Sequence, residues 1–128
     1  MVFSIRAACS GKVDSVELWQ NDISSNWQVN VRILCNSTYS AEYGFEPMSP
    51  SKGDGETQLA NISVAEGQTV FQGDIIGNLY AGRQYAHIHF GLLKNWIAIC
   101  PEPYFTIEAK ASIMRLIHKN FPSWNMCY

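Results

Sequence analysis

His87 and His89 are two of the three histidines of this 128-residue chain, and a single isoleucine separates them. The alternating segment around them predicts a β-strand, in which residues two apart point to one face and lie roughly 6.5–7 Å apart. We therefore expect both imidazoles to enter one site, as a metal ligand beside a general base. A catalytic zinc ion needs three protein ligands, and one strand supplies at most two. Further ligands must come from other parts of the chain.

Other chemical motifs are absent from the sequence. No His-x3-Asp or His-x3-His is present, no serine lies in a Gly-x-Ser-x-Gly turn, and no glycine-rich phosphate loop occurs. The nine Lys and Arg residues are scattered, and eleven Asp and Glu residues bring the formal charge to −2. This balance argues against a nucleic-acid partner. No apolar run approaches the ~20 residues of a transmembrane helix, and the N-terminus does not resemble a secretion signal.

The elements that position the histidines are predicted to be mainly strands. Alternation and β-branched residues indicate strands over 3–9, 11–18, 27–36 and 40–45. Residues 62–77 predict short strands joined by glycine turns. Between them, residues 46–61 are dense in Pro, Ser, Gly and Asp, which predicts a long, exposed and mobile loop.

The C-terminal part has a different pattern. Within an appended helical segment at 104–120, Thr106 is expected to cap a helix from about Ile107 to Lys119 that ends before Pro122. His118 lies at the end of this helix, where an imidazole suits the helix dipole, and we assign it a structural role. No linker or repeat divides the chain. The prediction is one mainly β domain, residues 1–128, with a C-terminal α-helix.

Four cysteines form no Cys-x-x-Cys pair, which argues against a zinc ribbon or a thioredoxin-type site. They allow three pairings. Cys9–Cys35 with Cys100–Cys127 is preferred, because each pair joins segments that could lie close in space, and closing the second loop would contribute about 3 kcal/mol. Buried free thiols are the alternative. The cysteines alone leave the compartment open.

The order of these segments resembles the lysostaphin-type zinc endopeptidases, the peptidase M23 family, which cleave bacterial cell-wall peptides. The resemblance covers residues 5 to about 95 and is carried by 5–13, 27–35, Tyr43, the glycine turns of 64–77 and the His-x-His-Phe segment of 86–92. It implies an antiparallel β-sheet of the barrel-sandwich hybrid (duplicated hybrid motif) kind. It also implies a location in the cell envelope or outside the cell.

The resemblance implies a role for each histidine. His89 would be a zinc ligand, and His87 would be a catalytic base or a stabiliser of the transition state. The family's remaining ligands, a His and an Asp, precede the segment matched by Ile5–Cys9, and this chain starts too late to contain them. By count from Tyr43, Phe45 stands where a further catalytic histidine is expected. A phenyl ring transfers no proton, so catalysis would be impaired. The two imidazoles alone are expected to hold zinc only weakly.

Three functional hypotheses follow. The first is a degenerate, non-catalytic M23-like domain that binds a cell-wall peptide, a glycan or a protein partner in a groove with aromatic walls. The second is a fragment or diverged form of a zinc endopeptidase. The third is a biotinyl or lipoyl carrier domain, although Lys52 does not have the setting of a carrier lysine. For the first hypothesis, the expected groove residues are Tyr43, Phe45, Tyr85 and Phe90.

Overall fold

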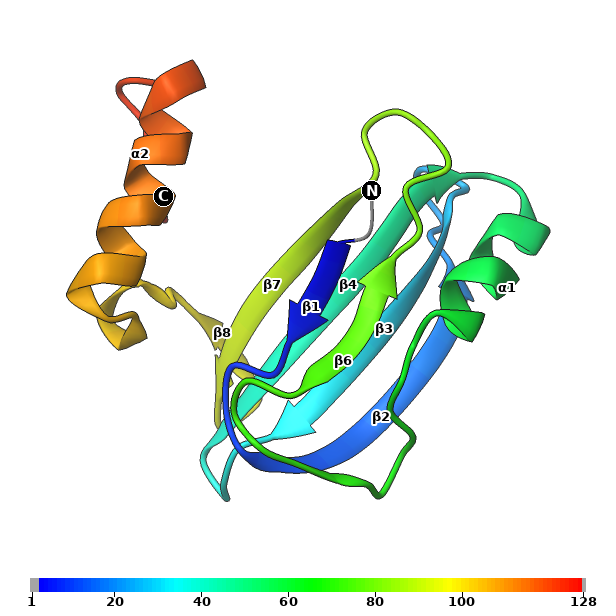
Figure 1. Cartoon of the computed structure of the whole chain (residues 1–128), viewed down its shortest axis with the longest axis horizontal. Helices are drawn as coiled ribbons and strands as arrows, with labels where there is room; N and C mark the ends of the chain where they lie inside the picture. Colours follow the sequence, from blue (N-terminus) through cyan, green and yellow to red (C-terminus); the bar gives the residue numbers. More distant parts are fainter. Residues whose placement is uncertain (1–2, 128) are drawn as a thin grey trace.

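The computed structural model describes residues 3–127 and is mainly β (Figure 1). Eight strands form two antiparallel sheets: a large one in the order β5-β2-β3-β4-β7-β8 and a small one made of β1 and β6. The strands are β1 (Phe3–Arg6), β2 (Gly11–Gln20), β3 (Trp27–Leu34), β4 (Tyr39–Ser49), β5 (Thr69–Val70), β6 (Ile75–Leu79), β7 (His87–Lys94) and β8 (Ile97–Ile99). The helices are α1 (Lys52–Ala60), a short 3-10 helix (Glu102–Tyr104) and α2 (Ile107–Asn120). A mainly β fold with a C-terminal helix is confirmed.

The hydrophobic core lies between the two sheets, and β1 and β6 cross in front of the large sheet in Figure 1. The alternation of β3 decides which side chains enter the core. Val29, Val31 and Ile33 are fully buried, whereas the polar residues between them point away from the small sheet. We call the side of the large sheet that faces the small sheet its inner face, and the opposite side its outer face. Burying the inner face is the main source of stability.

The prediction of a loop over residues 46–61 is wrong. β4 continues to Ser49, and Lys52–Ala60 form helix α1. Its glycines give poor helix propensity, but packing overrides it. A Cβ on Gly55 would lie 2.7 Å from the Cβ of Trp27, so only glycine allows the helix to approach β3 this closely. The fully buried Gln58 donates to the Asn78 carbonyl at 2.9 Å and accepts from the Tyr80 N–H at 2.7 Å, which ties α1 to β6.

Helix α2 matches its prediction within one residue and stands to one side of the sheets (Figure 1). The Thr106 hydroxyl accepts from the Ala109 N–H at 3.1 Å, as expected of an N-cap. None of its residues is buried. The preferred disulfide pairing is confirmed, with Cys9 bonded to Cys35 and Cys100 to Cys127. Among residues 3–127, no helix has both the length and the apolarity that a membrane span requires.

Candidate functional site

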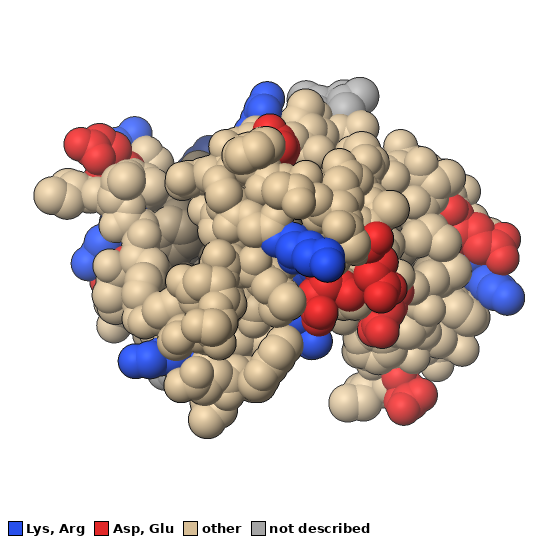
Figure 2. Space-filling view, turned by 90° about the horizontal axis from the view of Figure 1, so that it is seen from below, with Lys and Arg blue, Asp and Glu red and all other residues tan. Residues whose placement is uncertain are grey.

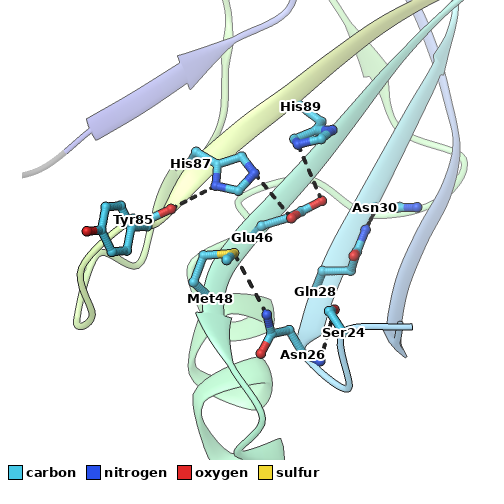
Figure 3. Close-up of polar contacts among 9 residues, drawn as sticks. All are labelled: Ser24, Asn26, Gln28, Asn30, Glu46, Met48, Tyr85, His87 and His89. Atoms are coloured by element: carbon cyan, nitrogen blue, oxygen red, sulfur yellow. Dashed lines mark hydrogen bonds and ion pairs between the residues drawn. The ribbon is translucent and has the colours of Figure 1, made fainter. Parts of the chain in front are cut away.

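Both histidines and one carboxylate share the outer face. Strand β7 pairs antiparallel with β4, so that His87 lies opposite Glu46 and His89 lies opposite Gly44. Residues directly opposite in an antiparallel pair point to the same side of the sheet. Their side chains therefore gather over the outer face, where Figure 3 shows Glu46 reaching toward both rings. The expectation that the two imidazoles enter one site is confirmed.

The contacts within this cluster are close. The Nε2 atom of His87 lies 3.2 Å from Oε2 of Glu46, and Nε2 of His89 lies 3.9 Å from Oε1 of the same carboxylate. The other ring nitrogen of His87, Nδ1, lies 2.7 Å from the carbonyl oxygen of Tyr85 (Figure 3). The two rings are 4.7 Å apart between centroids. Glu46 is mostly covered, whereas the His89 side chain is 68% exposed. We call Glu46, His87 and His89 the His–Glu cluster.

Beside the cluster the outer face is hollowed, with a cavity volume of about 240 Å³. Gly44 forms part of its floor: a Cβ there would lie 3.4 Å from Cβ of His89 and 3.5 Å from Oδ1 of Asn30. The Gln28 amide donates to this Asn30 oxygen at 3.1 Å, which orients both amides along the hollow. Amide and carboxylate groups predominate among the lining side chains of Gln28, Asn30, Glu42, Glu46 and His89. The hollow is therefore a polar, shallow site open to solvent.

The four predicted groove aromatics do not share one surface. Phe45 is fully buried on the inner face and cannot form an aromatic wall, so that prediction is wrong. The Tyr43 ring is also buried: its backbone adjoins the hollow, but its hydroxyl accepts from the Ala8 N–H at 2.7 Å. Burial raises the pKa of this phenol above its ordinary value. Phe90 packs 5.4 Å from Tyr43 between centroids, and the exposed Tyr85 lies in the loop before β7.

Glu46, whose carboxylate lies next to both histidine rings, was not identified from the sequence. Counting from Tyr43 pointed to Phe45, but adjacent residues of a strand point to opposite faces. The signal was present in β4, where Ala41, Tyr43 and Phe45 alternate with the polar Glu42 and with Glu46. The third histidine, His118, lies on α2 and contacts the Trp124 carbonyl through Nε2 at 2.9 Å. It is not part of the cluster.

The His–Glu cluster fits a divalent metal ion. One donor atom from each of its three residues lies within 4.8 Å of the other two. Two imidazole nitrogens and a carboxylate oxygen are ligands that zinc accepts, and three protein ligands leave one position open. An ion bound there would act as a Lewis acid on a ligand in the hollow.

Two further features lie outside the outer face. An apolar cavity of about 440 Å³ separates the inner side of Phe90 and Leu92 from the C-terminal segment around Tyr104 and Phe105. Lys52 begins α1, where it lies 5.7 Å from the Trp27 ring and contacts Glu56, and so it is not at a hairpin tip. In the view from below, acidic side chains gather near the middle of the molecule with a basic side chain beside them, and the other visible Lys and Arg side chains are scattered (Figure 2).

Comparison with known proteins relates the fold to solved structures. No family model and no curated protein sequence matches the chain. A chain of the SpoIIQ–SpoIIIAH pore-forming complex matches with a TM-score of 0.57 and 22% identity, over 85% of this chain and 61% of that one. A zinc-containing peptidase from Vibrio cholerae matches with a TM-score of 0.51 and 21% identity, over 76% of this chain and 26% of that one.

A third match is the catalytic domain, studied as a point mutant, of the prophage-encoded M23 protein EnpA from Enterococcus faecalis. Its TM-score is 0.53 at 22% identity, over 81% of this chain and 71% of that one. The chain thus spans less than two thirds of the first two matches and somewhat more of the third. These likenesses agree with the segment order of the sequence and with the antiparallel sheet that carries the histidine pair. The chain has an M23 peptidase-like fold.

Proposed function

We propose that this chain is a non-catalytic M23-like domain that binds a short peptide of the bacterial cell wall in the hollow of its outer face. The fold supports the proposal, because the resemblance associates this fold with cell-wall peptides. The polar hollow beside His89 supports it as well, since it offers a site next to the histidine pair. Both disulfides favour an oxidising compartment, as expected of a cell-envelope or secreted protein.

The main support for a non-catalytic role is that the cluster has too few functional groups for zinc-dependent hydrolysis. Zinc-dependent peptide hydrolysis needs three protein ligands and a separate group that moves the proton, which makes four. The His–Glu cluster supplies three, and the remaining histidine is on α2. If Glu46 is a ligand, the only other carboxylate that lines the hollow among residues 3–127 is Glu42, which is paired with Arg32. If Glu46 is the base, the cluster has only two ligands left. Losing one positioned acid–base group typically costs about 10²- to 10⁴-fold in rate.

The lining of the hollow indicates the chemistry of the ligand. The Gln28 and Asn30 side chains can donate to and accept from a peptide backbone, and Glu42 and Glu46 add negative charge suited to an amino group. Glu42 forms an ion pair with Arg32. Glu46 lies beside the two histidines and has no Lys or Arg partner among the described residues, so its charge is the one available to an amino group. Cell-wall peptides present both backbone amides and amino groups.

The experiment is a titration of the ¹⁵N-labelled chain with soluble muropeptides, followed by amide chemical shifts. We expect the shifts to concentrate at Gln28, Asn30 and Gly44 on the outer face, with α2 unchanged. Shifts confined to α2 or to the apolar cavity, or none at millimolar muropeptide, would contradict the proposal. In that case a protein partner becomes the better interpretation, because a chain of the SpoIIQ–SpoIIIAH complex has this fold.

A diverged zinc endopeptidase is the second candidate. Its supporting observation is that the cluster brings three zinc-type donors together on the M23-like sheet. This candidate requires a further group from outside the described residues. It predicts zinc-dependent cleavage of cross-linked muropeptides, measured by mass spectrometry, and loss of cleavage in His89→Ala. For the third hypothesis, a carrier domain, the position of Lys52 at the start of α1 gives no support.

A further inference from the structure

We infer that the His–Glu cluster is itself a complete three-ligand site for a late divalent transition metal such as zinc, with Glu46 and His87 serving as ligands rather than as proton-transfer groups. The inference deepens the proposed function and rests on it only in treating the outer face as a binding surface. It differs from the family-based expectation, which makes His89 a ligand, His87 a base and upstream residues the other ligands.

The His87 ring has a polar neighbour at each of its two nitrogens. A carbonyl oxygen can only accept hydrogen bonds, so the 2.7 Å contact with Tyr85 places the proton on Nδ1. A neutral imidazole carries one N–H, and Nε2 is then left with its lone pair. That lone pair faces a carboxylate oxygen of Glu46 at 3.2 Å. Two lone pairs in contact need a positive species between them, which is either a second proton or a metal ion.

His89 supplies the third donor of the cluster. It directs Nε2 at the same carboxylate from 3.9 Å, and one donor atom from each of the three residues lies within 4.8 Å of the other two, so that one metal ion could bind all three. Metal ligands at 2.0–2.1 Å in a tetrahedral shell are about 3.3 Å apart. The 3.2 Å spacing between His87 Nε2 and Oε2 of Glu46 is close to this value, and the 3.9 Å spacing between His89 Nε2 and the other oxygen, Oε1, exceeds it by about 0.6 Å. The exposed His89 ring can close that gap by a small rotation.

The surroundings also fit a metal site. A hydrogen bond from the non-ligating nitrogen to a backbone carbonyl is the usual support of a metal-bound histidine, because it fixes the tautomer and the ring orientation. The Tyr85 carbonyl supplies it, from a residue with φ of +71°, a conformation uncommon outside glycine. Two nitrogens and one oxygen suit Zn²⁺, Cu²⁺ or Ni²⁺ better than Mg²⁺ or Ca²⁺. Glu46 and His89 line the hollow, so a peptide carbonyl bound there could complete the shell of an ion held by the cluster.

The test is titration of the chelator-treated, disulfide-intact chain with Zn²⁺ alone, followed by calorimetry, and with Co²⁺, followed by its visible spectrum. We expect one ion per chain with Kd below about 100 μM. His89→Ala and Glu46→Gln should each weaken binding by at least about tenfold, since even outer-shell partners contribute roughly 10- to 100-fold. His118→Ala is the matched control and should bind like the unsubstituted chain, and Mg²⁺ should not compete.

No binding at 1 mM Zn²⁺ would overturn the inference, and so would binding that Glu46→Gln leaves unchanged or that His118→Ala weakens equally. Muropeptide titrations of the metal-free and zinc-loaded chain separate this inference from the proposed function. Peptide binding by a chain that takes up no zinc overturns only the inference. Zinc binding with these variant effects but without peptide binding overturns only the proposed function.

Discussion

The two faces of the large sheet are built from the same strands but differ in what their side chains do. On the inner face, Val29, Val31 and Phe45 are fully buried against the small sheet. On the outer face, the neighbours of these residues, such as Asn30 and Glu46, are polar and gather around a hollow. A face without apolar contacts contributes little to stability. Its polar residues are thus free to serve binding, and a change of one position along a strand exchanges the two roles.

The largest expected effect distinguishes neighbours on β4. Phe45→Ala should lower the free energy of unfolding by about 3–5 kcal/mol, because it removes a fully buried ring and leaves a cavity. Glu46→Ala, one residue further, should change it by less than about 1 kcal/mol, since its ion-pair contacts are with the partly exposed His87 and the exposed His89 and are screened by solvent. Denaturant unfolding with both disulfides intact measures the difference. Equal losses at the two positions would show that the faces do not differ in this way.

A buried polar side chain, Gln58, can be compared with an exposed one on the same helix. Gln58 lies on the covered side but holds two backbone groups of the β6 end through hydrogen bonds. Gln58→Leu should lower the free energy of unfolding by about 1–3 kcal/mol, because the Asn78 carbonyl and the Tyr80 N–H lose their partners. Glu56→Ala on the exposed side of α1 is the control, expected to cost no more than about 0.5 kcal/mol. A neutral Gln58→Leu would mean that these bonds are replaced by water.

The outer face should respond to changes in shape more than in stability. Gly44→Ala places a methyl group on the floor of the hollow, 3.4 Å from Cβ of His89. We expect muropeptide binding to weaken roughly tenfold, about 1.4 kcal/mol, with the free energy of unfolding changed by less than about 1 kcal/mol. Gly53 lies in α1, outside the lining of the hollow, and an added Cβ there would meet only Oγ of Ser51 at 3.6 Å, so Gly53→Ala should bind normally. Equal weakening in both variants would place the ligand elsewhere.

The smallest effect concerns Tyr43 at alkaline pH. Burial raises the pKa of its phenol, so the folded state holds the proton more tightly than the unfolded state. This contribution is complete below the unfolded pKa of about 10 and is lost as the pH rises through the folded pKa. Between about pH 9 and 11 the chain should lose more stability than Tyr43→Phe, as measured by urea midpoints. An identical slope in the variant would contradict the buried phenol.

Periodicity predicted the parts of this fold whose stability is local to a strand or helix. The alternation of residues 27–33 gave β3 its inner and outer faces, and Thr106 with the following apolar spacing gave α2 its start. Periodicity did not predict α1, because two glycines and nearby prolines indicate a loop. The helix instead depends on the packing of Gly55 against Trp27 and on the hydrogen bond of Gln58 with β6. Such contacts join residues about 20 or more positions apart and leave no local pattern.

The candidate site was predicted in part. The spacing of His87 and His89 placed both on one face, since a strand repeats every two residues. The third group was missed because the count from Tyr43 favoured Phe45, and the pairing of β4 with β7 that brings Glu46 opposite His87 was not in the sequence pattern. The aromatic groove was wrong for a related reason. Alternation separates Phe45 from the histidines, and Tyr85 lies before the strand begins.

The outer face is proposed to bind cell-wall peptides without cleaving them. Incubating the zinc-loaded, disulfide-intact chain with cross-linked muropeptides and following their masses over a day tests this most directly. We predict that the muropeptides stay intact although the same material produces the outer-face amide shifts. Zinc-dependent cleavage products that disappear in His89→Ala would contradict it.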